Sequence, residues 1–98
     1  MRFVVRARIS TEAGNKVLKD PRFIQKIEEY IRKTRAEGAY FFESGGDRTM
    51  TFIIEIQSAD QIPAIAEPLF QDFGANVEFH PVMLLDDLKK AIQNVMAK

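Results

Sequence analysis

The sequence predicts an α+β fold, in which a four-stranded antiparallel sheet packs two helices on one face and carries a further helix at the C-terminus. Four segments alternate apolar and polar residues with a period of two, which is typical of half-buried strands, and three segments repeat apolar residues at helical spacing. Their order along the chain, β α β β α β α, joins two βαβ-like halves through a hairpin. With 98 residues, the chain is predicted to form one domain over residues 1–98.

The composition fits a folded domain and disfavours several classes of function. Hydrophobic residues make up 46% of the chain, which is enough for a core. Fourteen basic and fourteen acidic residues cancel, so we expect no nucleic-acid partner. The chain has no cysteine, which excludes a thiolate nucleophile and a Cys-type zinc site. No stretch approaches the ~20 apolar residues that span a bilayer, so we expect no membrane partner and a cytoplasmic location.

The first part of the chain, up to residue 38, is predicted to form a strand, a helical turn and a helix. Residues 2–9 form the first strand, with alternate apolar residues facing the core: Phe3, Val5, Ala7 and Ile9. Residues 12–19 are interpreted as a loose helical turn. Asp20-Pro21 is a helix start signal, because Asp caps N–H groups and Pro suits the first helical position. Gly38 is the predicted terminator of this helix.

The second half begins with a hairpin and ends with a helix. Residues 39–44 and 49–57 are predicted strands, joined by the turn-forming residues 45–48. Ser58 and Gln61 form a possible capping box, with Asp60 as the alternative cap of the next helix. Pro68 is expected to kink this helix or to end its first part near Glu67, and Gly74 to close it. A strand over residues 75–82 and an amphipathic helix over residues 85–96 complete the chain.

This order of elements predicts a ferredoxin-like βαββαβ fold, with the sheet order 4-1-3-2 and both main helices on one face. The opposite face of the sheet is mixed in character. It is predicted to carry Val4, Arg6, Arg8, Ile53, Glu55, Glu78 and His80. A second copy of the same sheet commonly covers such a face, and the amphipathic C-terminal helix can complete the seal. We therefore expect a homodimer.

Several short sequence segments resemble those of small bacterial proteins of the dimeric α/β-barrel superfamily. The run QIPAIAEPLF followed by VEFHPVM, and the order of elements, are distantly similar to muconolactone isomerase, an enzyme of that superfamily. The phrases AGN, AYF, EPLF and HPVM are more similar to uncharacterised bacterial members. The resemblance implies a ferredoxin-like fold and a dimer in which two sheets face each other around a shared cavity. It implies no reaction.

Two groups of charged residues are candidate site residues. His80 is the only histidine and the first candidate for an acid or base, and Glu78 on the same face could orient its ring. Hydrogen bonding at a strand end explains His80 equally well. Arg6 and Arg8 share one face of the first strand and could hold a carboxylate ligand. Glu55 and Glu78 are competing partners, because ion pairs within the chain or across the dimer also use such arginines.

The remaining candidate side chain is aromatic, and the sequence predicts neither a metal nor a cofactor. Tyr40 belongs to the aromatic run 40–42 and could give its hydroxyl group to a cavity or to the subunit interface, although such a run more often belongs to the core. One histidine and scattered carboxylates have no recognisable metal-ligand spacing, so we predict no metal site.

These observations favour a homodimeric small-molecule-binding or accessory domain of unknown ligand. Its cavity would be lined by apolar groups and by Arg6, Arg8, Tyr40, Glu55 and Glu78, together with His80. The alternative is a cofactor-independent isomerase or monooxygenase acting on a small, partly aromatic acid, with His80 as the proton shuttle and Arg6 or Arg8 as the carboxylate clamp. In a third, purely structural alternative the partner packs the face completely and leaves no cavity.

Overall fold

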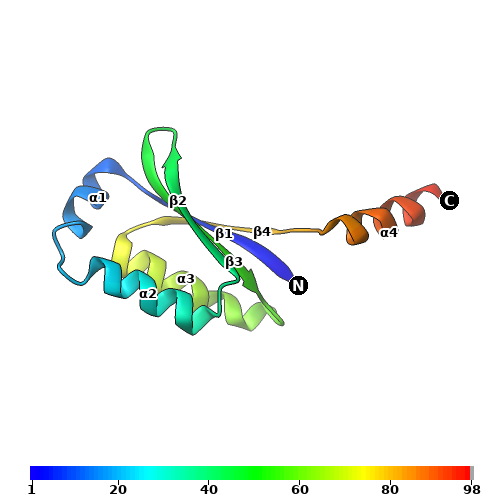
Figure 1. The fold of residues 1–98 in the computed structure, drawn as a ribbon, viewed down its shortest axis with the longest axis horizontal. Helices are drawn as coiled ribbons and strands as arrows, with labels where there is room; N and C mark the ends of the chain where they lie inside the picture. Colours follow the sequence, from blue (N-terminus) through cyan, green and yellow to red (C-terminus); the bar gives the residue numbers. More distant parts are fainter. Residues whose placement is uncertain (98) are drawn as a thin grey trace.

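A computed structural model describes residues 1–97 and contains one four-stranded antiparallel sheet (Figure 1). The elements are β1 (Arg2–Ile9), α1 (Thr11–Val17), α2 (Phe23–Thr34), β2 (Gly38–Ser44), β3 (Asp47–Glu55), the short 3₁₀ helix η1 (Ala59–Gln61), α3 (Ile62–Phe73), β4 (Asn76–Pro81) and α4 (Leu85–Met96). The strand order β2-β3-β1-β4 is the predicted order 4-1-3-2. The α+β class and the ferredoxin-like arrangement are therefore confirmed.

The core lies between the sheet and the helices α2 and α3, which pack on the same face of the sheet (Figure 1). β1 and β3 are adjacent in the sheet centre, and their register places Val5 opposite Phe52 and Ala7 opposite Met50. The alternate residues predicted to face the core are buried in both central strands: Val5, Ala7 and Ile9 of β1, and Met50, Phe52 and Ile54 of β3. Leu69 and Phe73 of α3 fill the other side of the same core.

Two helix boundaries differ from the predicted ones at the start of the chain. The expected loose turn over residues 12–19 is a regular helix, α1, whose first turn is capped by the Ser10 hydroxyl group accepting from the Ala13 N–H at 3.1 Å. α2 begins at Phe23, after the predicted Asp20-Pro21 start. Asp20 still acts at this end, because its carboxylate accepts from the Arg22 N–H at 2.8 Å and from Lys26 Nζ at 2.7 Å.

The prediction that Gly38 ends the first main helix is wrong. α2 ends at Thr34, and Arg35 takes the left-handed conformation with φ 55°. The N–H of Ala36 then donates to the Ile31 carbonyl group at 3.2 Å, and Ala36 packs against the core. Because this apolar contact reverses the chain directly after α2, Gly38 is already the first residue of β2.

The hairpin is confirmed, with a tighter turn than expected. Gly45 and Gly46 alone form the loop, with φ 60° and 86°, and Asp47 already belongs to β3. Two successive positive φ angles match the right-handed twist of paired strands, and glycine adopts them without a Cβ clash.

The second main helix continues through Pro68 to Phe73 as α3, so Pro68 does not end its first part near Glu67, which was one of the two predicted alternatives. A proline removes one N–H and deprives the carbonyl group four residues earlier of its partner. That carbonyl group belongs to Ala64, an exposed residue, while Leu69 and Phe73 anchor the following turn in the core. The Ser58–Gln61 capping box and the Gly74 terminator, with φ 60°, are both confirmed.

The predicted C-terminal helix is present as α4, and it projects away from the rest of the chain (Figure 1). The chain measures 55 × 28 × 19 Å, and its radius of gyration is 15.8 Å. A compact chain of this length would have a radius of gyration of about 13 Å. No side chain of Leu85–Met96 is buried. Among residues 1–97, the helices all fall short of the length and apolar character that crossing a membrane requires.

Tyr30 forms a buried hydrogen bond within the core, and its contribution to stability can be measured. Its ring packs 4.8 Å from the ring of Phe52, and its hydroxyl group donates to the Ile65 carbonyl group at 2.8 Å. We expect Tyr30→Phe to keep the packing and to lower the free energy of unfolding by about 1 kcal/mol, the usual net value of one hydrogen bond. Urea unfolding followed by circular dichroism measures this difference. An unchanged midpoint would contradict the hydrogen bond.

The same residue predicts an alkaline loss of stability. Burial raises the pKa of the Tyr30 hydroxyl group well above its ordinary value. The folded protein therefore keeps this proton above pH ~10, where the unfolded chain releases it. The stabilisation is complete below pH ~10 and falls as the pH rises further, so the wild type should lose stability more steeply than Tyr30→Phe in that range. Parallel slopes for the two proteins would contradict the assignment.

Candidate functional site

One face of the sheet carries the residues that the sequence singled out. α2 and α3 cover the opposite face, whereas no helix of residues 1–97 lies over this one (Figure 1). We call it the open face, and it consists of Val4, Arg6 and Arg8 of β1, Tyr40 and Phe42 of β2, Thr51 and Ile53 of β3, and Glu78 and His80 of β4. The face combines an aliphatic pair, Val4 and Ile53, and two aromatic residues, Tyr40 and Phe42, with a group of charges.

Glu78 and His80 form a contact on β4. His80 Nε2 lies 2.9 Å from Glu78 Oε1, and the two side chains are 56% and 57% exposed. The hydrogen bond from His80 lowers the pKa of the Glu78 carboxyl group, and the positive charges of Arg6 and Arg8 act in the same direction. The positive charge of Arg6 acts on Glu78 because the strand register places Glu78 of β4 opposite Arg6 of β1. The carboxylate thus orients an imidazole ring that water still reaches.

Arg6 reaches across β3 to β2, whereas Arg8 contacts the first residue of β3. The Arg6 guanidinium carbon lies 6.0 Å from the centre of the Phe42 ring, and its Nη2 donates to the Ser44 hydroxyl group. Arg8 Nε lies 3.5 Å from an Asp47 carboxylate oxygen. Arg6 is therefore held by an aromatic ring and a neutral hydroxyl group, and its guanidinium retains donors for an anion.

Tyr40 shares a row with these residues, whereas Glu55 lies apart from them. Tyr40 is 62% exposed and stands opposite Thr51, which in turn stands opposite Arg6. Glu55 stands opposite Arg2, four residues from Arg6 along β1, which corresponds to roughly 13 Å.

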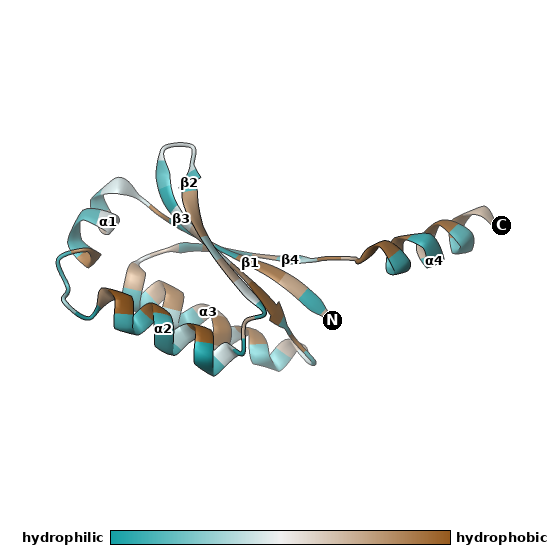
Figure 2. Ribbon diagram, viewed as in Figure 1, coloured by the Kyte–Doolittle hydropathy of each residue, from teal (hydrophilic) through white to brown (hydrophobic). Residues whose placement is uncertain are grey.

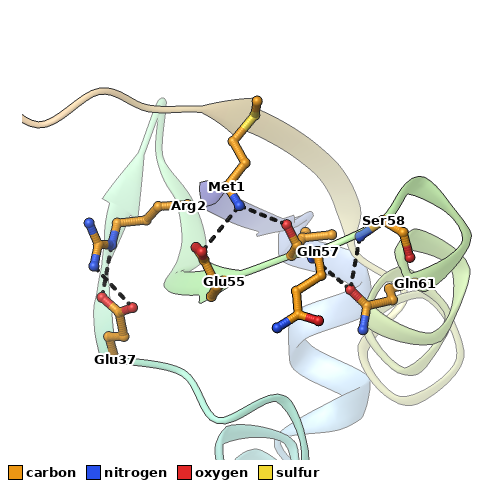
Figure 3. Close-up of polar contacts among 8 residues, drawn as sticks. Met1, Arg2, Glu37, Glu55, Gln57, Ser58 and Gln61 are labelled. Carbon is orange, nitrogen blue, oxygen red and sulfur yellow. Dashed lines mark hydrogen bonds and ion pairs between the residues drawn. The ribbon is translucent and has the colours of Figure 1, made fainter. Parts of the chain in front are cut away.

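At that end of the sheet the charges already have partners. Glu55 contacts the amino group of Met1 at 3.1 Å, and Arg2 forms a two-pronged contact with Glu37 at 2.9 and 3.2 Å (Figure 3). The structure therefore brings together five of the six predicted site residues and separates Glu55 from them.

One residue of the aromatic run lines a second surface, which was not predicted from the sequence. Phe41 is 55% exposed and points to the helix side of the hairpin, where an apolar groove of about 610 Å³ lies between the hairpin, the α1–α2 connection and α2. We call it the hairpin groove, and its apolar lining includes Val17, Leu18, Phe23, Ile24, Ile31 and Phe41. The signal was present in the sequence, since Leu18 and Ile24 exceed what one side of a small core can bury.

Over the described part of the chain, no three His, Asp or Glu side chains converge in a way that could hold a metal ion. Within residues 1–97 every buried polar side-chain atom has a hydrogen-bond partner. The open face, which carries the predicted site residues, and the apolar hairpin groove are the candidate sites.

Comparison with known proteins supports the fold and nothing more specific. No protein-family model and no curated protein matches the chain. Among solved structures, a formyltetrahydrofolate deformylase from Pseudomonas putida KT2440 is similar to 84% of the chain, with a TM-score of 0.52 and 12% identity. The chain spans 29% of the length of that enzyme. A de novo designed protein, Ferredog-Diesel, is similar to 83% of the chain and 85% of its own, with a TM-score of 0.49 and 16% identity.

The Glu78–His80 contact predicts a measurable change in titration. His80→Ala removes the hydrogen bond, so we expect the pKa of the Glu78 carboxyl group to rise toward its ordinary value. Carboxyl ¹³C NMR titration measures this. Asn76→Ala, on the same face of β4, is the control and should leave the Glu78 titration unchanged.

Because both side chains are more than half exposed, the melting temperature of His80→Ala should stay close to that of the wild type at neutral pH. Because the pKa of Glu78 is lowered in the folded protein, the contact stabilises the fold fully only at a pH above the pKa of an unfolded glutamate, ~4.3. This stabilisation disappears as the pH falls through the pKa of Glu78 in the folded protein. A large drop in melting temperature at neutral pH would instead assign His80 a structural role.

Proposed function

We propose that residues 1–98 act as one homodimeric domain that binds a small molecule, either as a binding protein or as an accessory domain, in a cavity between two open faces. The observation that carries this proposal is a sheet face with oriented charges beside exposed aromatic rings, over which residues 1–97 place no helix. Arg6, Glu78 and His80 supply the charges, and Tyr40 and Phe42 the rings.

A second copy of the open face is a suitable cover for the first. Two sheets packed face to face lie about 10 Å apart, so long side chains can meet while smaller ones leave space for a ligand. Val4 and Ile53 stand opposite each other on adjacent strands and offer an apolar contact for the partner. A two-fold axis would duplicate every charge on the face, including Arg6 and Arg8.

The chemistry of the face favours a small carboxylic acid with an aromatic part. A guanidinium group binds a carboxylate through two parallel hydrogen bonds, and Arg6 and Arg8 project from the same side of one strand. Tyr40 and Phe42 lie on the adjacent edge of the face and would contact the apolar part of such a ligand.

The Glu78–His80 contact specifically favours a second candidate function. A carboxylate that fixes an imidazole ring at 2.9 Å is a common arrangement for a general base. In this alternative, the domain is a cofactor-independent isomerase or monooxygenase acting on a small, partly aromatic acid. His80 would move the proton, while Arg6 or Arg8 holds the carboxylate.

Binding of benzoate, used as a probe, tests the main proposal. We expect benzoate to shift the backbone NMR signals of the open face in the wild type, and the double variant Arg6→Gln/Arg8→Gln to bind it at least about tenfold more weakly, since a hydrogen bond to a charged group contributes about 1.5–3 kcal/mol. Arg2→Gln is the matched control, because Arg2 lies on the same strand and is already paired with Glu37.

Equal weakening by the control variant, or shifts confined to other surfaces, would contradict the assigned site. Native mass spectrometry of the wild type tests the dimer separately. A mass of one chain at micromolar protein concentration would contradict the facing sheets on which the cavity depends.

Deuterium exchange tests the enzymatic alternative. Small aryl acids with a C–H bond next to the carboxyl group are incubated with the protein in D₂O, and incorporation is followed by NMR. If His80 is a proton shuttle, wild-type protein should accelerate the exchange and His80→Ala should abolish the acceleration while remaining folded. Equal exchange with both proteins would exclude this role of His80.

A further inference from the structure

Two apolar surfaces of this chain lack a cover among residues 1–97. The first is one side of α4, where hydrophobic and hydrophilic residues alternate along the turns of the ribbon (Figure 2). The apolar residues follow helical spacing, and each is at least 42% exposed: Leu85, Leu88, Ile92, Val95 and Met96. We call them the α4 stripe. The second surface is the hairpin groove.

A helix such as α4 requires a packing surface. It has 12 residues, and isolated helices shorter than about 12–15 residues are marginal in water. None of its side chains is buried against its own subunit. The surface that stabilises α4 must therefore come from elsewhere.

α4 lies away from α2 and the hairpin, which form the groove of its own chain (Figure 1). β4 ends opposite Phe3, whereas the groove is lined by Ile9 at the other end of β1, roughly 20 Å away along the strand. The groove also lies beside β2, three strands from β4, which adds roughly 14 Å across the sheet. Residues 82–84 connect β4 to α4 and can span only about 10 Å.

We propose that the α4 stripe of one copy docks into the hairpin groove of a second copy, and that the exchange is reciprocal. The inference rests on the proposed pairing of two copies and adds the elements that join them. The stripe has the spacing i, i+3, i+7 that a helix uses in an apolar groove, and a volume of about 610 Å³ accepts several of its side chains.

The charges that border the two surfaces are complementary. Glu28 and Glu43 line the groove together with Arg48. On α4, Lys89 lies one turn from Leu85 and therefore flanks the stripe, and the first turn of the helix is acidic. Docking of the stripe would place Lys89 near the groove carboxylates Glu28 and Glu43. Two-fold symmetry would form each of these contacts twice.

Disulfide trapping tests this contact directly, because the chain contains no cysteine. Protein carrying Ile24→Cys in the groove is mixed with protein carrying Ile92→Cys in the stripe, and both positions are exposed. We expect a 24–92 disulfide between chains, identified by mass spectrometry of the linked peptides. Lys90→Cys, on the opposite side of α4, is the matched control and should link to position 24 at least about tenfold more slowly.

Equal trapping at positions 90 and 92, or the formation of 24–24 and 92–92 links alone, would overturn the proposal. A second variant, Leu88→Asp/Ile92→Asp, measures the contribution of the stripe without altering the core of the subunit. We expect its dimer dissociation constant, determined by sedimentation, to rise at least about tenfold, because two charges would have to enter an apolar groove. Lys90→Glu is its control.

The outcomes separate this inference from the proposed function. An unchanged dimer of Leu88→Asp/Ile92→Asp would overturn the docking of α4 and leave the facing sheets intact. A monomeric wild type would overturn both. An apolar small molecule retained in the groove, with NMR contacts to Leu18 and Ile24 and with no trapping at position 92, would assign the groove to that molecule and overturn the docking.

Discussion

The pairing of β1 with β3 at the centre of the sheet is the constraint on which the rest of the structure depends. Alternate residues of both strands, among them Val5, Ala7, Met50 and Phe52, lie under the helices, whereas Arg6 and Arg8 lie on the open face. A slip of one residue in β1 would drive Arg6 and Arg8 into the core, at a cost that no ion pair offsets. The same alternation therefore produces the stability of the core and the chemistry of the open face.

The elements that follow local rules could be predicted from the sequence. Strand alternation, the hairpin around residues 45–48 and the Gly74 terminator each depend on a few neighbouring residues, and all are present, although the hairpin loop is shorter than predicted. The errors arise where a tertiary contact outweighs a local preference. Arg35 adopts a left-handed conformation because Ala36 must reach the core, and Pro68 is tolerated because the next turn of α3 is buried on one side and open to water on the other.

The sequence predicts which residues lie on the open face better than it predicts which of them contact each other. Period-two alternation is enough to place Arg6, Arg8, Glu78 and His80 on one face, but the offset between strands decides which of them meet. That offset leaves Glu55 beside the amino group of Met1, far from Glu78. Leu18 and Ile24 signal a surplus of apolar residues, but the position of the hairpin groove was not predictable, because it depends on how the hairpin packs against α2 and the connection before it.

The short connection before α4 bears on the kind of assembly that this chain can form. Only residues 82–84 separate the helix from the sheet, and the Val82 N–H is fixed to the Arg2 carbonyl group at 3.0 Å. A protruding helix on a long, flexible tether could reach any neighbour and build open-ended chains of subunits. A tether this short fixes the direction of the helix relative to its own sheet, so it also fixes the rotation between two copies that exchange helices. A two-fold rotation closes the exchange into the dimer proposed above, whereas another rotation would continue it into a ring or a filament.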